Sequence, residues 1–165
     1  MKISDRQNQI IKILQEEEHP QSGTALAQRF GVSRQIIVKD IGVLKAFGIN
    51  IISTNRGYKI DGEGSLTYII ESHHEDKDIR DELNTIVDNG GIVVDVFINH
   101  PVYGVIKKDL DIHSRSGVTN FVKNMTTSIP LKNLTEDIHY HTIKVKSEED
   151  FDRIKKALAE KGYLN

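Results

Sequence analysis

The sequence predicts an α/β (α+β) protein with two domains, and three patterns carry that prediction. A polar, glycine-rich run at residues 61–65 divides the 165-residue chain and has the composition of a linker. Before this run, three segments with apolar residues at helical spacing precede a short hairpin pattern. After it, strand and helix patterns alternate in the order β-α-β-β-α-β and end in one more helix, an order typical of a ferredoxin-like domain. We therefore expect domains at residues 1–62 and 63–165.

Composition excludes several classes of protein. The chain contains no cysteine, which removes disulfides, thiolate catalysis and zinc–thiolate sites and fits a reducing compartment. No apolar stretch approaches the roughly 20 residues that a membrane-spanning helix needs. The first residues turn polar at once and show no signal-peptide pattern. We therefore expect a cytoplasmic protein with no membrane partner.

Charge is distributed unevenly between the two halves. Residues 1–60 carry nine Lys and Arg against five Asp and Glu, a net charge of +4, so the whole-chain value of −2 leaves −6 for the remainder. A small basic part joined to an acidic part predicts a nucleic-acid-binding module attached to something with a different task. Chance clustering of solvated charges is the alternative explanation.

The first domain is predicted to contain three helices. Ser4 can cap the first helix, and Ser22 or Thr24 can begin a short second one. Gly31 follows that helix at once and supplies a tight turn, after which Ser33 can cap a third helix of about a dozen residues. The side chains expected to face inward are Ile10, Ile11, Leu14, Leu26, Ala27, Phe30, Ile37, Ile41 and Leu44.

A hairpin completes this domain and indicates how it acts. Strand patterns at residues 51–54 and 58–60 flank a turn that carries Arg56 at its tip. Helix, helix, glycine turn, capped helix and basic hairpin together define a winged helix-turn-helix, which binds double-stranded DNA. The third helix presents Arg34 and Gln35, which suit guanine and adenine edges, whereas Ser33 and Arg56 suit phosphates. The predicted DNA-contacting residues are Ser33, Arg34, Gln35, Lys39 and Arg56. A helical bundle with a polar surface is the alternative.

Residues 24–41, from Thr-Ala-Leu-Ala to Val-Lys-Asp-Ile, also resemble a known family. They are similar to the winged helix-turn-helix of biotin-operon-type repressors and many small bacterial regulators. One departure is Ala25, where that family often has a glutamate that completes a capping box. The resemblance therefore implies a second helix that is less well capped, with little consequence for DNA binding.

The second domain is predicted from its alternating patterns. Strands are expected at residues 66–72, 92–99, 105–112 and 138–145, and helices at 75–88, from Ser114 or Ser116 to 125, and from Ser147 onward.

Histidines in this domain fall in a pattern that suits a metal ion. His139 and His141 lie two residues apart on a strand, so both side chains leave the same face. The first and fourth strands of a ferredoxin-like sheet are antiparallel neighbours, which brings His74 beside this pair, and Glu82 is the best-placed carboxylate. These donors suit one Zn, Ni, Co or Fe(II) ion per chain. Exposed surface histidines are the alternative, and His73 competes with His74 because a one-residue slip exchanges their faces.

Three short motifs resemble the 3H (three-histidine) domain: residues 89–96, residues 100–104 and residues 139–143. With the winged helix, nearly the whole chain resembles the niacin-responsive transcriptional repressors of bacterial NAD metabolism. The resemblance implies a cytoplasmic homodimer that binds operator DNA and uses nicotinic acid as co-repressor. It also implies metal ligands at His74, Glu82, His139 and His141.

Effector contacts and rival functions remain open in the sequence. His100 and Tyr103 are candidates to contact nicotinate, although His100 has an equally good role in shaping the turn before Pro101. The closest alternative is a regulator that senses the metal itself. A metallohydrolase would need a further general base or a second metal. A biotin protein ligase would need a longer chain and a glycine-rich adenylate loop.

Overall fold

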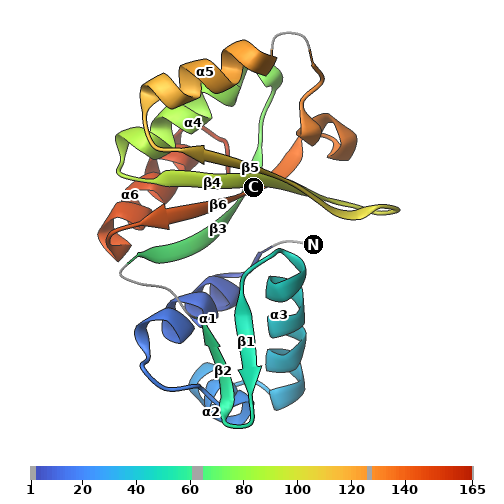
Figure 1. The fold of residues 1–165 in the computed structure, drawn as a ribbon, viewed down its shortest axis with the longest axis vertical. Helices are drawn as coiled ribbons and strands as arrows, with labels where there is room; N and C mark the ends of the chain where they lie inside the picture. Colours follow the sequence, from blue (N-terminus) through green and yellow to red (C-terminus); the bar gives the residue numbers. More distant parts are fainter. Residues whose placement is uncertain (1–2, 61–64, 126–127, 165) are drawn as a thin grey trace. The chain divides into compact units, whose positions relative to one another are not determined.

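The chain folds into two compact units in a computed structural model that describes residues 3–60, 65–125 and 128–164 (Figure 1). The predicted boundary between residues 62 and 63 lies outside the described residues. In the described residues, no helix combines the length and the apolar character needed to cross a membrane.

The first unit contains the predicted helices and hairpin, with the bounds α1 Asp5–Glu16, α2 Gly23–Phe30, α3 Arg34–Ala46, β1 Ile51–Thr54 and β2 Gly57–Ile60. Ser4, Ser22 and Ser33 cap the three helices, so Ser22 rather than Thr24 begins α2. Gly31 ends α2 at φ 62°, a left-handed conformation that favours glycine, and this confirms the predicted turn. All of the expected inward-facing side chains are buried except Phe30, which is half-buried.

One buried carboxylate in this unit was not predicted. Asp40 lies on the inner face of α3 and accepts hydrogen bonds from Arg6 Nε at 2.7 Å and Gln7 Nε2 at 3.0 Å. Because both donors belong to α1, the contact holds α3 at a fixed position against α1. The exposed face of α3 is thereby fixed as well.

The second unit has the predicted β-α-β-β-α-β order and the extra helix. Its elements are β3 Leu66–His73, a 3₁₀ turn Asp76–Asp78, α4 Ile79–Asp88, β4 Ile92–His100, β5 Gly104–Ile112, α5 Arg115–Met125, a 3₁₀ turn Leu131–Thr135, β6 Ile138–Val145 and α6 Glu148–Glu160. The helix expected from residue 75 starts as the 3₁₀ turn and becomes α-helical only at Ile79.

Strand order in the sheet departs from the ferredoxin-like arrangement in one respect. The order is β3-β6-β4-β5, with every neighbouring pair antiparallel. The first strand pairs with the fourth and the second with the third, as in a ferredoxin-like sheet, but the central pair joins the fourth and second strands instead of the first and third. Charged residues at positions 107–109 explain why β5 lies at an edge, since charges protect edge strands from further pairing.

Helices α4, α5 and α6 cover one face of this sheet (Figure 1), and the core lies between them. On β6, Ile143 and Val145 point into that core. Because side chains alternate along a strand, His139 and His141 leave β6 on the same face, farther toward its start. The histidine pair therefore occupies the polar end of an otherwise apolar layer.

Candidate DNA interface and candidate metal centre

The N-terminal end of α3 presents the polar surface that the sequence predicts. Ser33, Arg34, Gln35 and Lys39 are all exposed, while Ile37, Ile41 and Leu44 are buried on the opposite face. The Ser33 hydroxyl accepts the Ile36 N–H at 3.3 Å and so holds the first turn of the helix. This arrangement leaves hydrogen-bonding side chains at the helix end that enters a major groove.

The hairpin lies beside that helix end. Tyr58 and Gln21 exchange two backbone hydrogen bonds of 2.8 Å, which join β2 to the segment before α2. A Cβ on Gly57 would lie 2.3 Å from the Gln21 carbonyl oxygen, so only glycine permits this approach. Arg34 and Arg56 line one surface depression with the start of α2. Two guanidinium groups beside a helix N-terminus form a surface suited to DNA phosphates.

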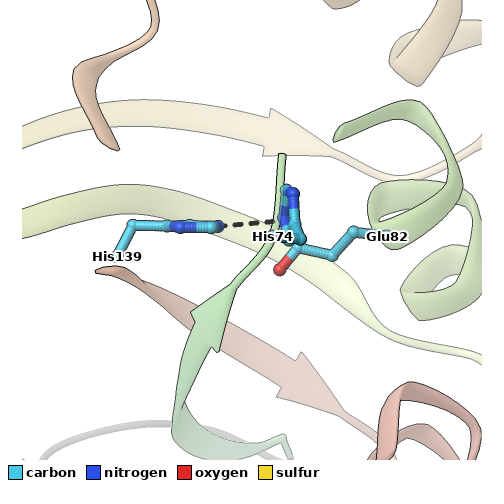
Figure 2. A group of neighbouring side chains, drawn as sticks. All are labelled: His74, Glu82 and His139. Atoms are coloured by element: carbon cyan, nitrogen blue, oxygen red, sulfur yellow. Dashed lines mark hydrogen bonds and ion pairs between the residues drawn. The ribbon is translucent and has the colours of Figure 1, made fainter. Parts of the chain in front are cut away.

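Three imidazoles and one carboxylate converge at the polar end of the second unit. His74 follows β3, Glu82 lies in the first turn of α4, and His139 projects from β6 (Figure 2). Glu82 Oε2 lies 2.7 Å from Nε2 of His74 and 3.3 Å from Nε2 of both His139 and His141. The strand register places Ser72 opposite His139, which explains why His74 arrives beside this pair.

Each of the three rings is anchored by its other nitrogen. Nδ1 of His74 donates to the Glu75 carbonyl at 2.8 Å, and Nδ1 of His139 donates to that of Asp137 at 2.8 Å. Nδ1 of His141 donates to the Asp95 carbonyl at 2.9 Å. A backbone acceptor at Nδ1 fixes the orientation of the ring. In the neutral ring the proton then stays on Nδ1, and the lone pair of Nε2 is free to bind a metal, as in metal-binding histidines.

The cluster is buried, and its ionisable groups shift one another's pKa values. The four side chains are between 1 and 4% exposed. Burial alone would raise the pKa of Glu82, but charge and hydrogen bonds from His141 and His139 hold it well below its ordinary value. Burial opposes the charged form of His74 and His141 too, yet Glu82 raises the pKa of both imidazoles. Titratable groups shifted by burial together with specific charged partners are typical of functional sites.

The donor atoms also fit a transition metal in spacing and chemistry. Ligand atoms bound to one tetrahedral ion at ~2.05 Å stand about 3.3 Å apart. The separations from Glu82 to His139 and His141 are both 3.3 Å, whereas the 2.7 Å between Glu82 and His74 is a direct hydrogen bond that a bound ion would replace. The group whose ligand atoms all lie within 4.8 Å of one another contains His74, Glu82 and His139 but not His141. Glu82 Oε1 is buried with no hydrogen-bond partner among the described residues. An N₃O set with one orphaned carboxylate oxygen suits Zn, Ni, Co or Fe(II).

Asp95 supports this cluster from the neighbouring strand, and the sequence reasoning did not identify it. A β-bulge between Val93 and Asp95 interrupts the ladder to β6. The Asp95 carboxylate accepts the Thr142 N–H at 3.1 Å and pairs with Lys107 Nζ at 2.9 Å. Its carbonyl is thereby placed to receive His141. A lone acidic residue between the apolar residues Val94 and Val96 was the available signal.

Lys132 is a second supporting residue, and nothing in the sequence around it indicates that role. Its ammonium group is buried, donates to the His74 carbonyl at 2.9 Å, and pairs with Asp76 at 2.7 Å and with Asp137. Burial would lower the pKa of Lys132, but the two carboxylates outweigh this and raise it. The contact ties the segment that carries His74 to the one before His139.

Replacing Asp95 with alanine should weaken metal binding through His141. The Thr142 N–H would lose its acceptor inside the sheet, and we expect about 1–3 kcal/mol less stability. Loss of such an outer contact should lower metal affinity about 10- to 100-fold. Asp95→Asn keeps an acceptor oxygen and should lose less. Asp109 lies opposite Asp95 on β5 but is exposed, so Asp109→Ala is the control. Thermal unfolding and metal titration test this, and equal metal affinity in Asp95→Ala and Asp109→Ala would contradict it.

The remaining predicted residues lie apart from the cluster. His73 is exposed, as its opposite strand face requires. Tyr103 is 75% exposed at the β4–β5 turn, and His100 stacks on it with ring centroids 4.8 Å apart. Nδ1 of His100 accepts the backbone N–H groups of Val102 and Tyr103, both at 3.2 Å, so His100 shapes the turn. Neither residue lines the cavity of about 180 Å³ that opens onto Glu82, His139 and His141.

Comparison with known proteins agrees with both units. Residues 67–165 match the 3H domain family, and residues 6–59 match a family of HTH domains. The chain is 39% identical over 163 residues to the probable transcription repressor NiaR of Thermotoga maritima, covering 97% of this chain and 93% of that protein. It is 36% identical over 168 residues to the transcription repressor NadR of Bacillus subtilis, covering 98% and 93%.

These full-length relatives are named as repressors, which excludes the metallohydrolase considered above. Together with the match to HTH domains, these names identify the first unit as the DNA-binding domain. The chain belongs to the 3H-domain family of helix-turn-helix transcription repressors.

Proposed function

We propose that this repressor controls genes of NAD biosynthesis and niacin uptake, with nicotinic acid as co-repressor bound in a metal-containing 3H domain. The observation that carries the proposal is the buried cluster of His74, Glu82, His139 and His141. It opens onto a cavity of about 180 Å³ in the same chain as an exposed recognition helix. The motif resemblance to niacin-responsive repressors supplies the identity of the effector.

These four residues would hold one transition-metal ion. When bound, an ion that takes more than these four ligands would supply a Lewis-acidic position for a pyridine nitrogen. The protein's part is to keep that position dry and the three rings oriented. Carbonyl oxygens of Glu75, Asp137 and Asp95 perform the orientation.

Regulation requires the effector to distinguish two arrangements of the repressor. Operators present two half-sites about one helical turn apart, so we propose that the protein acts as a homodimer in which the 3H domain supplies most of the dimer contact. Nicotinate can tighten operator binding only if it binds the DNA-competent arrangement more strongly than the other arrangement. Such a coupling free energy is typically about 1–3 kcal/mol.

A DNA-binding titration with four conditions tests the proposal. Operator affinity is measured for the metal-free protein, with metal alone, with nicotinate alone and with both. We expect strong operator binding only with both. Tightening by metal alone, unaffected by nicotinate, would instead identify a regulator that senses the metal. No response to either would contradict effector control.

A further inference from the structure

The cavity beside the histidine cluster is polar at one end and mostly apolar elsewhere. Glu82, His139 and His141 form its polar end, whereas its walls are mostly apolar and come from α4, α5 and the segment after α5. Leu83 and Phe121 are examples of these wall residues. Such a cavity suits a small flat ring with one polar atom directed at the cluster.

Among the described residues that line this cavity, two are lysines, and one of these has an ammonium group available to a ligand. The ammonium group of Lys132 already donates a hydrogen bond to the His74 carbonyl and forms ion pairs with Asp76 and Asp137. Lys108 is exposed on β5, and its ammonium group has no hydrogen-bond or ion-pair partner within residues 3–60, 65–125 and 128–164. An anion that enters the cavity therefore meets one uncompensated cation among the described lining residues.

Strand register places Lys108 on the same sheet face as the cluster. Val96 is the register partner of His141 on β6 and of Lys108 on β5. Partners directly opposite in antiparallel strands point to the same face, so His141, Val96 and Lys108 form a row. Two strand spacings separate the ends of that row, roughly 10 Å between backbones. A small ring over Val96 can face the cluster on one side and the lysine on the other.

We propose that Lys108 binds the carboxylate of the effector and thereby selects the acid over its uncharged amide. The inference rests on the proposed function, because it assumes that a pyridine carboxylate occupies this cavity. Across the row formed by His141, Val96 and Lys108, the ammonium group of Lys108 is the cationic end, so the carboxylate is directed toward it and away from the cluster. The ring nitrogen is left to face the histidines, and the amide lacks the charge that an ammonium group attracts.

The test compares nicotinate and nicotinamide binding by calorimetry, using the full-length protein with the transition metal that it retains on purification. Lys108→Met should weaken nicotinate binding about 10- to 100-fold, the worth of a charged hydrogen bond. Nicotinamide affinity should stay unchanged, so the preference for the acid should largely vanish. Lys108→Arg keeps the charge and should keep the preference. Metal content should match that of the wild type in both variants.

Matched variants separate this inference from general charge effects and from the hairpin turn. Lys156→Met removes the same charge from an exposed position on α6 and should leave both affinities unchanged. Wild-type nicotinate affinity in Lys108→Met would overturn the inference alone. Loss of binding in Tyr103→Ala but not in Lys108→Met would place the effector at the β4–β5 turn. No nicotinate binding by the wild type would overturn the proposed function and this inference together.

Discussion

Purified protein should contain about one transition-metal ion per chain, and His139→Ala or His141→Ala should lose it. Each substitution removes a donor atom that lies 3.3 Å from Glu82 Oε2. Loss of a contact outside the ligand set typically lowers metal affinity about 10- to 100-fold. We expect loss of a ligand to lower the metal affinity by more than this. Because a bound ion stabilises the folded state by mass action, the wild type should gain about 2.7 kcal/mol at a metal concentration 100 times Kd.

His73→Ala is the matched control for this prediction. His73 neighbours His74 in sequence but is exposed on the opposite face of β3, so its loss should leave metal content and metal-dependent stability unchanged. Elemental analysis and thermal unfolding with and without metal measure both quantities. A stoichiometric ion retained when both His139 and His141 are absent would show that these residues are not the ligands.

Arg34→Ala and Gln35→Ala should each reduce the preference for operator over other DNA by about 1–3 kcal/mol, the usual worth of a bidentate base contact. Both side chains are exposed at the N-terminal end of α3, the end of a recognition helix that contacts base edges in helix-turn-helix proteins. Arg56→Ala should act differently, because a hairpin contact to phosphate carries no sequence information. It should weaken binding to all sequences alike and lower the slope of affinity against salt by about 1.

Binding titrations on operator and unrelated duplexes at several salt concentrations separate these effects. Arg29→Ala removes a positive charge from α2, where the arginine lies 3.7 Å from Glu17, and lies outside both α3 and the hairpin. Arg29→Ala should change the preference for operator less than Arg34→Ala does, and the slope of affinity against salt less than Arg56→Ala does. Full operator preference in the Arg34 and Gln35 variants would show that α3 is not the recognition helix.

Most of the fold follows from local patterns in the sequence. Serine caps, helical spacing and strand alternation act over a few residues, so α1, α3 and β6 could be predicted closely. The meeting of His74 with His139 also followed, because it needs only antiparallel pairing of the first and fourth strands. Asp40 was missed because its burial depends on two partners in α1.

Asp95 and Lys132, which support the cluster, make contacts that no local sequence pattern reveals. Strand order places β6 beside β4, and only then can His141 reach the Asp95 carbonyl at 2.9 Å. Lys132 likewise joins segments distant in sequence. His100 and Tyr103 were predicted to contact the effector from their motif alone, and the structure places them at an exposed turn while that prediction stays untested.

Calorimetry of nicotinate binding, with and without operator DNA, tests the central claim most directly. If nicotinate tightens operator binding, operator must tighten nicotinate binding by the same factor, because the coupling free energy is reciprocal. For a coupling of about 1–3 kcal/mol, the metal-loaded protein should bind nicotinate about 5- to 150-fold more tightly when operator is present. Equal nicotinate affinity in both conditions would leave a DNA-binding protein and a ligand-binding protein in one chain, with no switch between them.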